Sequence, residues 1–230
     1  MTPLLLEVCP DADAMARRAA EIVARTARDA LETREPFTFA VSGGRTPWAM
    51  FAQLRTLDFP WSLTHIYQVD ERVAPDGDPS RNLTHLLENV PHEAHVHPMP
   101  VTDDHLWDAA TRYSLDLPAR FDLIHLGLGP DGHTASLVPN DPVLSVTDVD
   151  VALTQPYQGH IRMTLTYPVL DRARQVLWLV GGADKVDPLA RLIARDSSIP
   201  GSRVQTEQQR VVADRAAANQ LPSGEGVGGQ

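Results

Sequence analysis

The chain has 230 residues, 43 % of them hydrophobic, which is enough for one globular domain with a substantial core and too few for two large ones. Its 20 basic and 30 acidic residues give a formal net charge of -10, which argues against a protein that binds along nucleic acid or to an anionic membrane surface. The single cysteine, Cys9, excludes an internal disulfide, and no apolar run indicates a signal peptide or a membrane span, so we expect a cytoplasmic protein.

The first predicted unit is a helix, a strand, a glycine turn and a second helix. Apolar residues recur at helical spacing over 11–34, and an aspartate stands at the start to cap this helix. The β-favouring run 37–41 leads directly into Ser42-Gly43-Gly44, and helical residues follow over 48–54. A strand, a turn and a helix in this order are expected again further along the chain.

Three such units follow the first. Apolar strands are predicted over 65–69, 121–126 and 176–180, and after each loop a helix is expected to begin, near Leu83, Thr134 and Lys185 respectively. Near-continuous apolar strands alternating with helices are typical of a parallel sheet that is buried on both faces. We therefore expect the α/β class, with a doubly wound, mostly parallel, Rossmann-like sheet and helices on both faces. Residues 1–221 form a single domain in this prediction, and the glycine-rich tail 222–230 is expected to be disordered.

The first of the loops after these strands has the features of an anion site. In open parallel sheets ligands bind beyond the carboxyl ends of the strands, so the loops after Val41, Val69, Leu126 and Val180 should converge on one crevice. In Ser42-Gly43-Gly44-Arg45-Thr46 the glycines let backbone amides point into that crevice, and the two hydroxyls add donors. Close packing of helix on sheet is the alternative use of these small residues. G-x-G-x-x-G is absent from this loop and the P-loop pattern from the whole chain, so no nucleotide is expected here.

Positive charge is expected from two more of the loops. Arg72, in Asp70-Glu71-Arg72, stands where a buried strand ends and offers a planar fork for a carboxylate or phosphate, with Asp70 or Glu71 able to hold it. Lys185 is the only lysine of the chain and opens a helix after two glycines, where it can hold a phosphoryl group as a point charge. The alternatives are a solvated strand end and a free lysine on a helix face.

The segment 127–137 is the most informative part of the sequence. Glycines and a proline after an apolar strand place Asp131 and His133 two residues apart, a spacing that can put both side chains on one side of a turn. A carboxylate can then orient the imidazole, which takes up a proton near neutral pH, beside a helix that we expect to begin at Thr134. The alternative is an Asp-Gly turn followed by a helix cap.

Two other chemistries are not expected. His92, His95 and His97 lack the i, i+4 spacing of a two-histidine zinc helix, so we predict no metal site. The pattern G-x-S-x-G does not occur, so a serine nucleophile elbow has no support.

Taken together, these loops resemble the 6-phosphogluconolactonase family, with the matching segments in the same order over about residues 37–217. The segments that carry the resemblance are Ser42-Gly43-Gly44-x-Thr46-Pro47, Asp70-Glu71-Arg72, the run Gly127 to Leu137, Arg162-Met163-Thr164-Leu165-Thr166, Gly182-x-x-Lys185, Ile199-Pro200-x-Ser202-x-Val204 and Ala213-Asp214-x-Ala216-Ala217.

The resemblance implies hydrolysis of 6-phospho-D-glucono-1,5-lactone to 6-phosphogluconate, in the oxidative pentose phosphate pathway, without metal or organic cofactor. It implies that His133 is the general base that activates water and Asp131 its partner. It also implies that Arg72 and Lys185 line the pocket and that the loop from Ser42 to Thr46 receives the phosphate. Arg162 is matched without an assigned contact.

Departures from the family pattern and two rival functions stay open at this point. Arg45 stands where the family often has serine, and Ser80-Arg81-Asn82 takes the place of a commoner Ser-Asn pair, so the role of Arg81 is open. A deaminase-isomerase of amino-sugar phosphates on the same fold usually has Asp-Glu-Tyr in place of Asp70-Glu71-Arg72 and a glutamate shortly after the histidine. A non-catalytic sugar-phosphate sensor would need the anion loop but not Asp131 with His133. We expect a monomer, since the sequence has no obvious extra interaction segment.

Overall fold

The computed structural model describes residues 4–221, and the predicted disordered tail 222–230 lies outside that range. Seven strands form one parallel sheet in the order β1-β10-β9-β6-β2-β3-β5. They are β1 (Leu5–Cys9), β2 (Phe37–Val41), β3 (Thr64–Gln68), β5 (His95–His97), β6 (Leu123–Leu126), β9 (Val176–Val180) and β10 (Gln209–Asp214). A second, antiparallel sheet has the order β4-β8-β7, from β4 (Asp70–Arg72), β7 (Val151–Leu153) and β8 (Arg162–Leu165).

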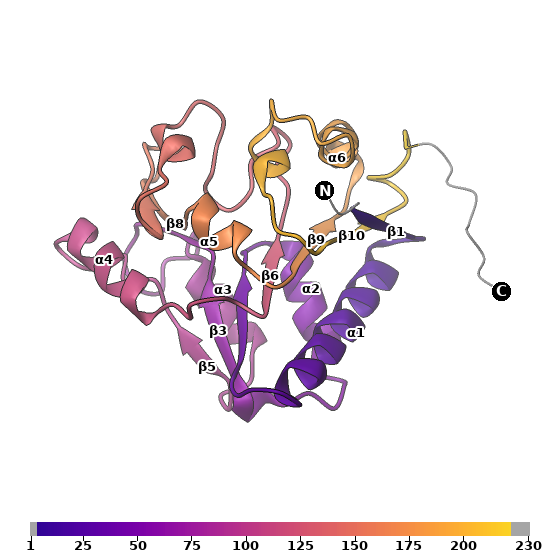
Figure 1. The fold of residues 1–230 in the computed structure, drawn as a ribbon, viewed down its shortest axis with the longest axis horizontal. Helices are drawn as coiled ribbons and strands as arrows, with labels where there is room; N and C mark the ends of the chain where they lie inside the picture. The colour runs from indigo at the N-terminus through magenta and orange to yellow at the C-terminus, as the bar shows by residue number, and fades with distance from the viewer. Residues whose placement is uncertain (1–3, 222–230) are drawn as a thin grey trace.

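Helices cover both faces of the parallel sheet, which confirms the doubly wound α/β prediction. They are α1 (Ala12–Leu31), α2 (Arg45–Leu54), α3 (Asn82–Asn89), α4 (Leu106–Asp116), α5 (Tyr167–Asp171) and α6 (Val186–Ile193), with short 3-10 turns at Trp61–Leu63, Pro142–Ser145, Ala183–Lys185 and Pro200–Arg203. Side chains alternate along β2, so that Phe39 and Val41 pack with α1 and α2, whereas Ala40 packs with the core that includes α4 and the small sheet. Figure 1 shows α1 and α2 lying together at one side of the molecule and α4 at the other.

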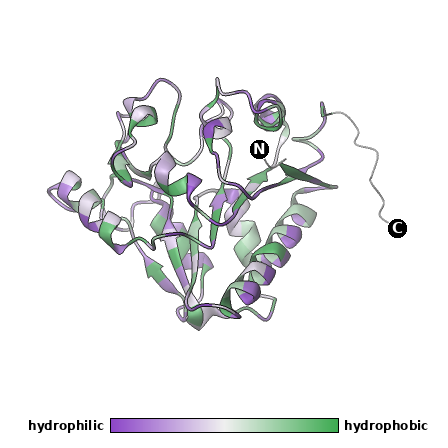
Figure 2. Ribbon diagram, viewed as in Figure 1, coloured by the Kyte–Doolittle hydropathy of each residue, from purple (hydrophilic) through white to green (hydrophobic). Residues whose placement is uncertain are grey.

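Helix α1 illustrates how the sequence determines an element. The Asp11 side chain accepts a hydrogen bond from the Ala14 amide at 2.8 Å, which caps the helix start. Its buried stripe consists mainly of alanine, with Met15, Ile22 and Val23 at helical spacing, so the helix packs closely on the sheet. Hydrophobic and hydrophilic residues accordingly alternate around its turns (Figure 2).

The strand order places a crevice at the centre of the sheet. From β2 the chain moves outward through β3 and β5, and it then returns to β6 on the other side of β2 and moves outward again through β9. The neighbours β2 and β6 therefore flank the point where the winding direction reverses, and ligands of such sheets bind beyond the carboxyl ends of the strands there. The loops that follow Val41 and Leu126 leave from this point.

The helix expected at Thr134 does not form. Thr134 to Leu137 make a turn instead, because Ala135 has φ 49° in the left-handed region and the Thr134 hydroxyl donates to the Gly127 carbonyl at 2.9 Å. Gly127 to Gly132 have the glycine spacing of a dinucleotide fingerprint, but with no helix behind them they lack its phosphate-binding geometry.

The small antiparallel sheet was not predicted, and it closes one side of the crevice. Strand β4 pairs with β8, so that Arg72 stands directly opposite Arg162. Because like charges on opposite strands repel one another, this pairing favours an anion between the two side chains.

Candidate active site

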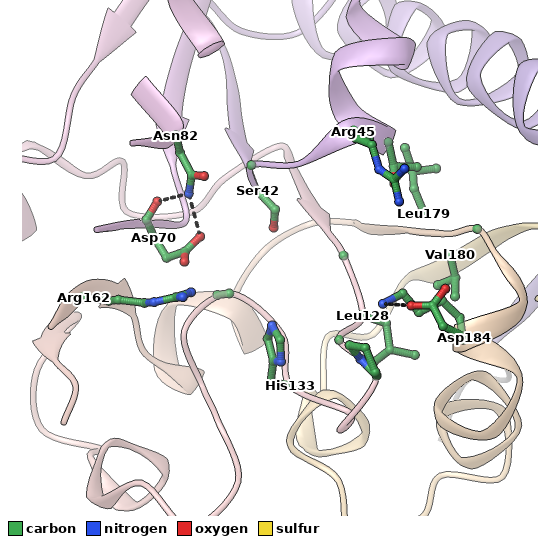
Figure 3. Close-up of a pocket in the computed structure, with 18 of the residues that line it drawn as sticks. Ser42, Arg45, Asp70, Asn82, Leu128, His133, Arg162, Leu179, Val180 and Asp184 are labelled. Atoms are coloured by element: carbon green, nitrogen blue, oxygen red, sulfur yellow. Dashed lines mark hydrogen bonds and ion pairs between the residues drawn. The ribbon is translucent and has the colours of Figure 1, made fainter. Parts of the chain in front are cut away.

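Four loops converge on a cleft of about 280 Å³ at the carboxyl ends of the central strands, as the sequence predicts. Eight of the ten predicted site residues line it: Ser42, Gly43, Arg45, Thr46, Arg72, His133, Arg162 and Lys185. The other two do not. Gly44 lines a neighbouring hollow that shares Arg72 and Arg162 with the cleft, and Asp131 stands behind His133. In Figure 3 His133 lies between Arg162 and Asp70 on one side and Arg45 and Asp184 on the other.

The Asp131–His133 pair has the geometry of a held base. The Asp131 Oδ1 atom lies 2.5 Å from His133 Nδ1 and also accepts the His133 backbone amide at 3.1 Å. An Nδ1–H donated to the carboxylate leaves the lone pair on Nε2, and within residues 4–221 no partner is present for that nitrogen. The ring fits only because residue 129 is glycine: a Cβ there would stand 2.1 Å from His133 Nδ1.

Tyr157 is a third member of this group, although no motif in the sequence indicated it. Its hydroxyl donates to Asp131 Oδ2 at 3.1 Å, and its ring lies edge-on to the His133 ring at 5.5 Å between centroids. Partial burial opposes ionisation of Asp131, but the charge and hydrogen bonds of His133 and the Tyr157 hydroxyl outweigh it and lower the pKa of that carboxyl. Burial and the Asp131 charge raise the pKa of Tyr157, so its hydroxyl remains a donor.

The two arginines of the small sheet are held by different partners. Arg72 donates through Nη1 to the Ser80 carbonyl and to Asn82 Oδ1, both at 2.7 Å. The expectation that Asp70 or Glu71 holds this guanidinium is wrong: Glu71 accepts the backbone amide of Arg72 and not its guanidinium, and the Asp70 carboxylate accepts from Ser136 and Asn82 instead.

Arg162 is 4 % exposed, and its guanidinium lies 5.0 Å from the centre of the Tyr157 ring. Burial, opposed by the Asp70 charge and assisted by that of Arg72, lowers the pKa of Arg162. Its buried Nε has no hydrogen-bond partner in the part of the chain that the structure describes. A buried cation with an unused donor beside an open cleft indicates a place for an anion.

Glu71 and Arg81 support the cleft from behind. Glu71 is fully buried and accepts the amides of Asn82 and Leu83, each at 2.8 Å, so it caps the start of α3. Arg81, whose role the sequence left open, is 2 % exposed and pairs with Glu71 and with Asp76. Both residues therefore hold Asn82 in place rather than face the cleft.

The glycine loop before α2 behaves partly as predicted. Ser42 does not offer free donors, since both its amide and its hydroxyl donate to the His125 carbonyl, at 3.3 and 3.2 Å. Helix α2 begins at Arg45, earlier than expected, and Gly44 before it has φ 121° and gives no side-chain cap. The amides of the first turn therefore have no partner within the helix. A Cβ at Gly43 would stand 1.9 Å from Asn82 Oδ1, so close packing also requires glycine here.

Lys185 lies on the opposite wall from Arg162. Its Nζ is 2.9 Å from the Asp184 carboxylate, and this hydrogen bond holds the pKa of Asp184 below its ordinary value. The Arg45 charge acts in the same direction. The lysine side chain is 19 % exposed, whereas that of Asp184 is 61 % exposed, so the ammonium faces the cleft from a partly buried position.

Asp70 and Asn82 also line the cleft, although the sequence indicated no role for Asn82 and expected Asp70 only as a partner of Arg72. Asp70 accepts a hydrogen bond from the Ser136 hydroxyl at 2.6 Å, and the Asn82 amide donates to the Asp70 carbonyl at 3.0 Å. The segment from Asp70 to Asn82 gives no periodic signal that would place Asn82 in the cleft, because its contacts depend on the turn before α3. In the described part of the chain, no group of three or more histidine, cysteine or acidic residues is arranged to hold a metal ion.

Comparison with known proteins identifies the family. Residues 10–213 match the family described as Glucosamine-6-phosphate isomerases/6-phosphogluconolactonase. The chain belongs to this family. The 6-phosphogluconolactonase of a Nostoc species is 32 % identical over 94 % of this chain and 98 % of that protein.

Two further members of the family differ in how much of their length is matched. The human GDH/6PGL endoplasmic bifunctional protein is 38 % identical over 77 % of this chain but only 25 % of its own length, so the chain spans about a quarter of that relative. The crystal structure of 6-phosphogluconolactonase from Thermotoga maritima superposes with a TM-score of 0.82 at 26 % identity, covering 92 % of this chain and 99 % of the other. The mostly parallel α/β fold is therefore that of the family. Over residues 4–221, no helix is long and apolar enough to cross a membrane.

Proposed function

We propose that this protein is a 6-phosphogluconolactonase that hydrolyses 6-phospho-D-glucono-1,5-lactone to 6-phospho-D-gluconate in the oxidative pentose phosphate pathway. The observation that carries this proposal is the Asp131–His133 pair, whose free ring nitrogen faces a cleft with positive charge on two walls. A lactone is an activated ester, so a positioned base and a site for the developing oxyanion are sufficient chemistry for its hydrolysis.

In the proposed reaction His133 Nε2 takes a proton from water while the water oxygen attacks the lactone carbonyl carbon. Negative charge collects on the carbonyl oxygen, where Arg72 and Arg162 supply positive charge. Collapse of the tetrahedral intermediate breaks the bond to the ring oxygen, which receives the proton back from the imidazolium and leaves as the 5-hydroxyl. Asp131 stabilises the imidazolium in between and, with Tyr157, keeps the ring in position.

The phosphate of the substrate would bind at the other wall. The first-turn amides of α2, Arg45 and Lys185 lie together there, and a helix start combined with a lysine is a favourable site for a dianion. Binding the far end of the substrate fixes the carbonyl beside His133, so that binding energy is used for orientation. A general base typically accelerates a reaction about 10²- to 10⁴-fold, and one oxyanion donor about 10²- to 10³-fold. Neither contribution requires a metal or an organic cofactor.

The family description also includes glucosamine-6-phosphate isomerases, which makes that activity the alternative. Residues after His133 are Thr134-Ala135-Ser136-Leu137, so no carboxylate follows it in the turn to move protons between adjacent carbons. A sugar-phosphate sensor would not require Asp131 and Tyr157 to hold the imidazole. The residues around His133 therefore favour lactone hydrolysis.

We propose that the protein acts as a monomer, because the base, the arginines and the lysine that the proposed reaction uses all belong to this chain. The lone buried Cys9 is consistent with the proposed cytoplasmic location. The direct test measures decay of the lactone near neutral pH and, in parallel, release of ammonia from glucosamine-6-phosphate. We expect accelerated lactone loss with no ammonia; ammonia without lactone loss would contradict the proposal.

A further inference from the structure

A second hollow, of about 620 Å³, lies away from the cleft. It is bounded by the last turns of α1 and by the residues that precede β6, β9 and β10. Because these strands are parallel, their amino ends meet at the edge opposite to the one that carries His133 and Lys185. The hollow is therefore separate from the candidate active site, with which it shares no lining residue.

The charge of this hollow is opposite to that of the molecule. Five arginines line it, and they are Arg25, Arg34, Arg120, Arg174 and Arg210. Only three carboxylates face them, from Asp29, Asp122 and Glu207, although the chain as a whole has a net charge of -10. A local excess of guanidinium groups in an acidic protein attracts multivalent anions.

Asp122 orients two of these arginines. It is 3 % exposed. Its Oδ1 atom accepts a hydrogen bond from Arg34 Nε at 2.7 Å and lies 3.3 Å from Arg174 Nε. Its other oxygen accepts the Thr38 amide and hydroxyl, at 2.9 and 3.0 Å. The carboxylate is thus fixed in the protein and holds both guanidinium groups at the wall, where each side chain remains more than a third exposed. Little side-chain entropy would be lost when these two groups bind a ligand.

The other three arginines have unused hydrogen-bonding capacity. Among the described residues, the buried Arg210 Nε has no partner, and the one acidic contact of this arginine is Glu7, at 3.7 Å. Within residues 4–221, Arg25 and Arg120 form no ion pair, and Arg120 makes one long hydrogen bond, 3.5 Å to the Ala173 carbonyl. Buried donors without partners are uncommon in folded proteins, and a bound anion would supply the missing acceptors.

We propose that this hollow, the basal arginine pocket, binds a compact metabolite or polymer that carries two or more phosphate groups. Asp122 holds Arg34 and Arg174 together, whereas Arg25, Arg120 and Arg210 have no part in that contact, so at least two phosphate groups are required to engage both sets of arginines at once. Ala30 is the only apolar residue among those that line the hollow, so there is no aromatic or aliphatic wall for a nucleobase. Inorganic polyphosphate or a sugar bisphosphate fits this chemistry better than a nucleotide does.

Isothermal titration with tripolyphosphate tests the proposal on the full chain. The pocket variant Arg25→Gln/Arg120→Gln removes two charges that make no structural ion pair, and the matched control Arg17→Gln/Arg55→Gln removes two arginines that line neither cavity. We expect at least about tenfold weaker binding in the pocket variant, as the loss of charge-assisted hydrogen bonds implies, and less than about twofold change in the control. Thermal unfolding shows whether both variants are folded. If the pocket variant is not folded, the single variant Arg120→Gln takes its place.

Three results would overturn the assignment. The first is equal loss of affinity in the pocket and control variants, which would mean unspecific attraction. The second is binding that Lys185→Gln removes and the pocket variant retains, because the probe would then occupy only the cleft. Orthophosphate should bind at least about tenfold more weakly than tripolyphosphate, and equal affinity would contradict the requirement for two phosphates. Titration with a hexose bisphosphate then distinguishes a sugar ligand from inorganic polyphosphate.

Discussion

The position of His133 depends on a glycine as well as on its hydrogen bonds to Asp131. Gly129 lies against the imidazole, and its amide donates to the His133 carbonyl at 2.8 Å, so the turn folds tightly around the ring. Asp131 can reach Nδ1 only in this arrangement. The spacing of Asp131 and His133 was sufficient to predict that they meet, because both belong to one short turn.

Gly129→Ala is therefore expected to displace the His133 ring and to lower kcat at least about 100-fold. This factor is the lower end of the rate acceleration that a general base usually supplies. The matched control is Gly127→Ala in the same loop, where an added Cβ meets nothing within 4 Å. Lactone turnover of the two variants, with circular dichroism to compare their folds, checks this. Equal activity of both would mean that the ring position is unimportant.

Tyr157 is expected to act as a positioning residue through Asp131. Tyr157→Phe removes one hydrogen bond to a charged group and should reduce kcat about tenfold with little change in KM. Tyr67→Phe, which alters a tyrosine packed against His97 outside the cleft, serves as control. Steady-state kinetics would speak against this role if KM rose while kcat stayed the same. Tyr157 was not predictable, because it lies in a loop far along the chain from Asp131.

At the scale of elements, strand β6 connects the two cationic sites and also holds a buried histidine. It follows directly after Asp122, which orients arginines at one edge of the sheet, and leads into the loop that carries His133 at the other edge. Between them His125 is completely buried, and burial lowers the pKa of His125 to about 3. No hydrogen-bond partner of the His125 Nε2 atom occurs between residues 4 and 221.

This histidine makes stability depend on pH. Below its ordinary pKa of 6.5 the unfolded chain binds a proton that the folded chain does not, so the free energy of unfolding falls as the pH falls from about 6.5 towards 3. Between pH 7 and 5 this one group should account for a loss of about 2 kcal/mol. His125→Met should remove that part of the loss in urea unfolding, whereas His92→Gln, at a 93 % exposed side chain, should not. The same pH dependence in wild type and His125→Met would contradict this explanation.

The elements themselves were predictable to the extent that they are buried. Strands β2, β6 and β9 are buried along their whole length and read as apolar runs. Strand β1 at the sheet edge is largely exposed, and β4 consists of three charged residues that form a strand only because β8 pairs with them. Such pairing depends on contacts between distant parts of the chain, which local propensity does not report.

At the scale of the whole molecule, the winding of the sheet assembles the site. The reversal between β2 and β6 brings the glycine loop, the Asp131–His133 turn and Lys185 to one edge, although they are far apart in sequence. This convergence followed from the strand pattern alone, whereas the small sheet that adds Arg72 and Arg162 did not. An acidic protein can thus present two separate cationic surfaces, one for each edge of its central sheet.

The central claim is that His133 activates water on a lactone whose phosphate is bound elsewhere in the cleft. The most direct measurement compares His133→Ala with wild type for turnover of 6-phospho-D-glucono-1,5-lactone and, by calorimetry, for binding of 6-phosphogluconate. We predict at least about a 100-fold loss of turnover with product affinity within a few-fold of wild type, because base and phosphate site are separate. Near-normal turnover in His133→Ala would contradict the claim.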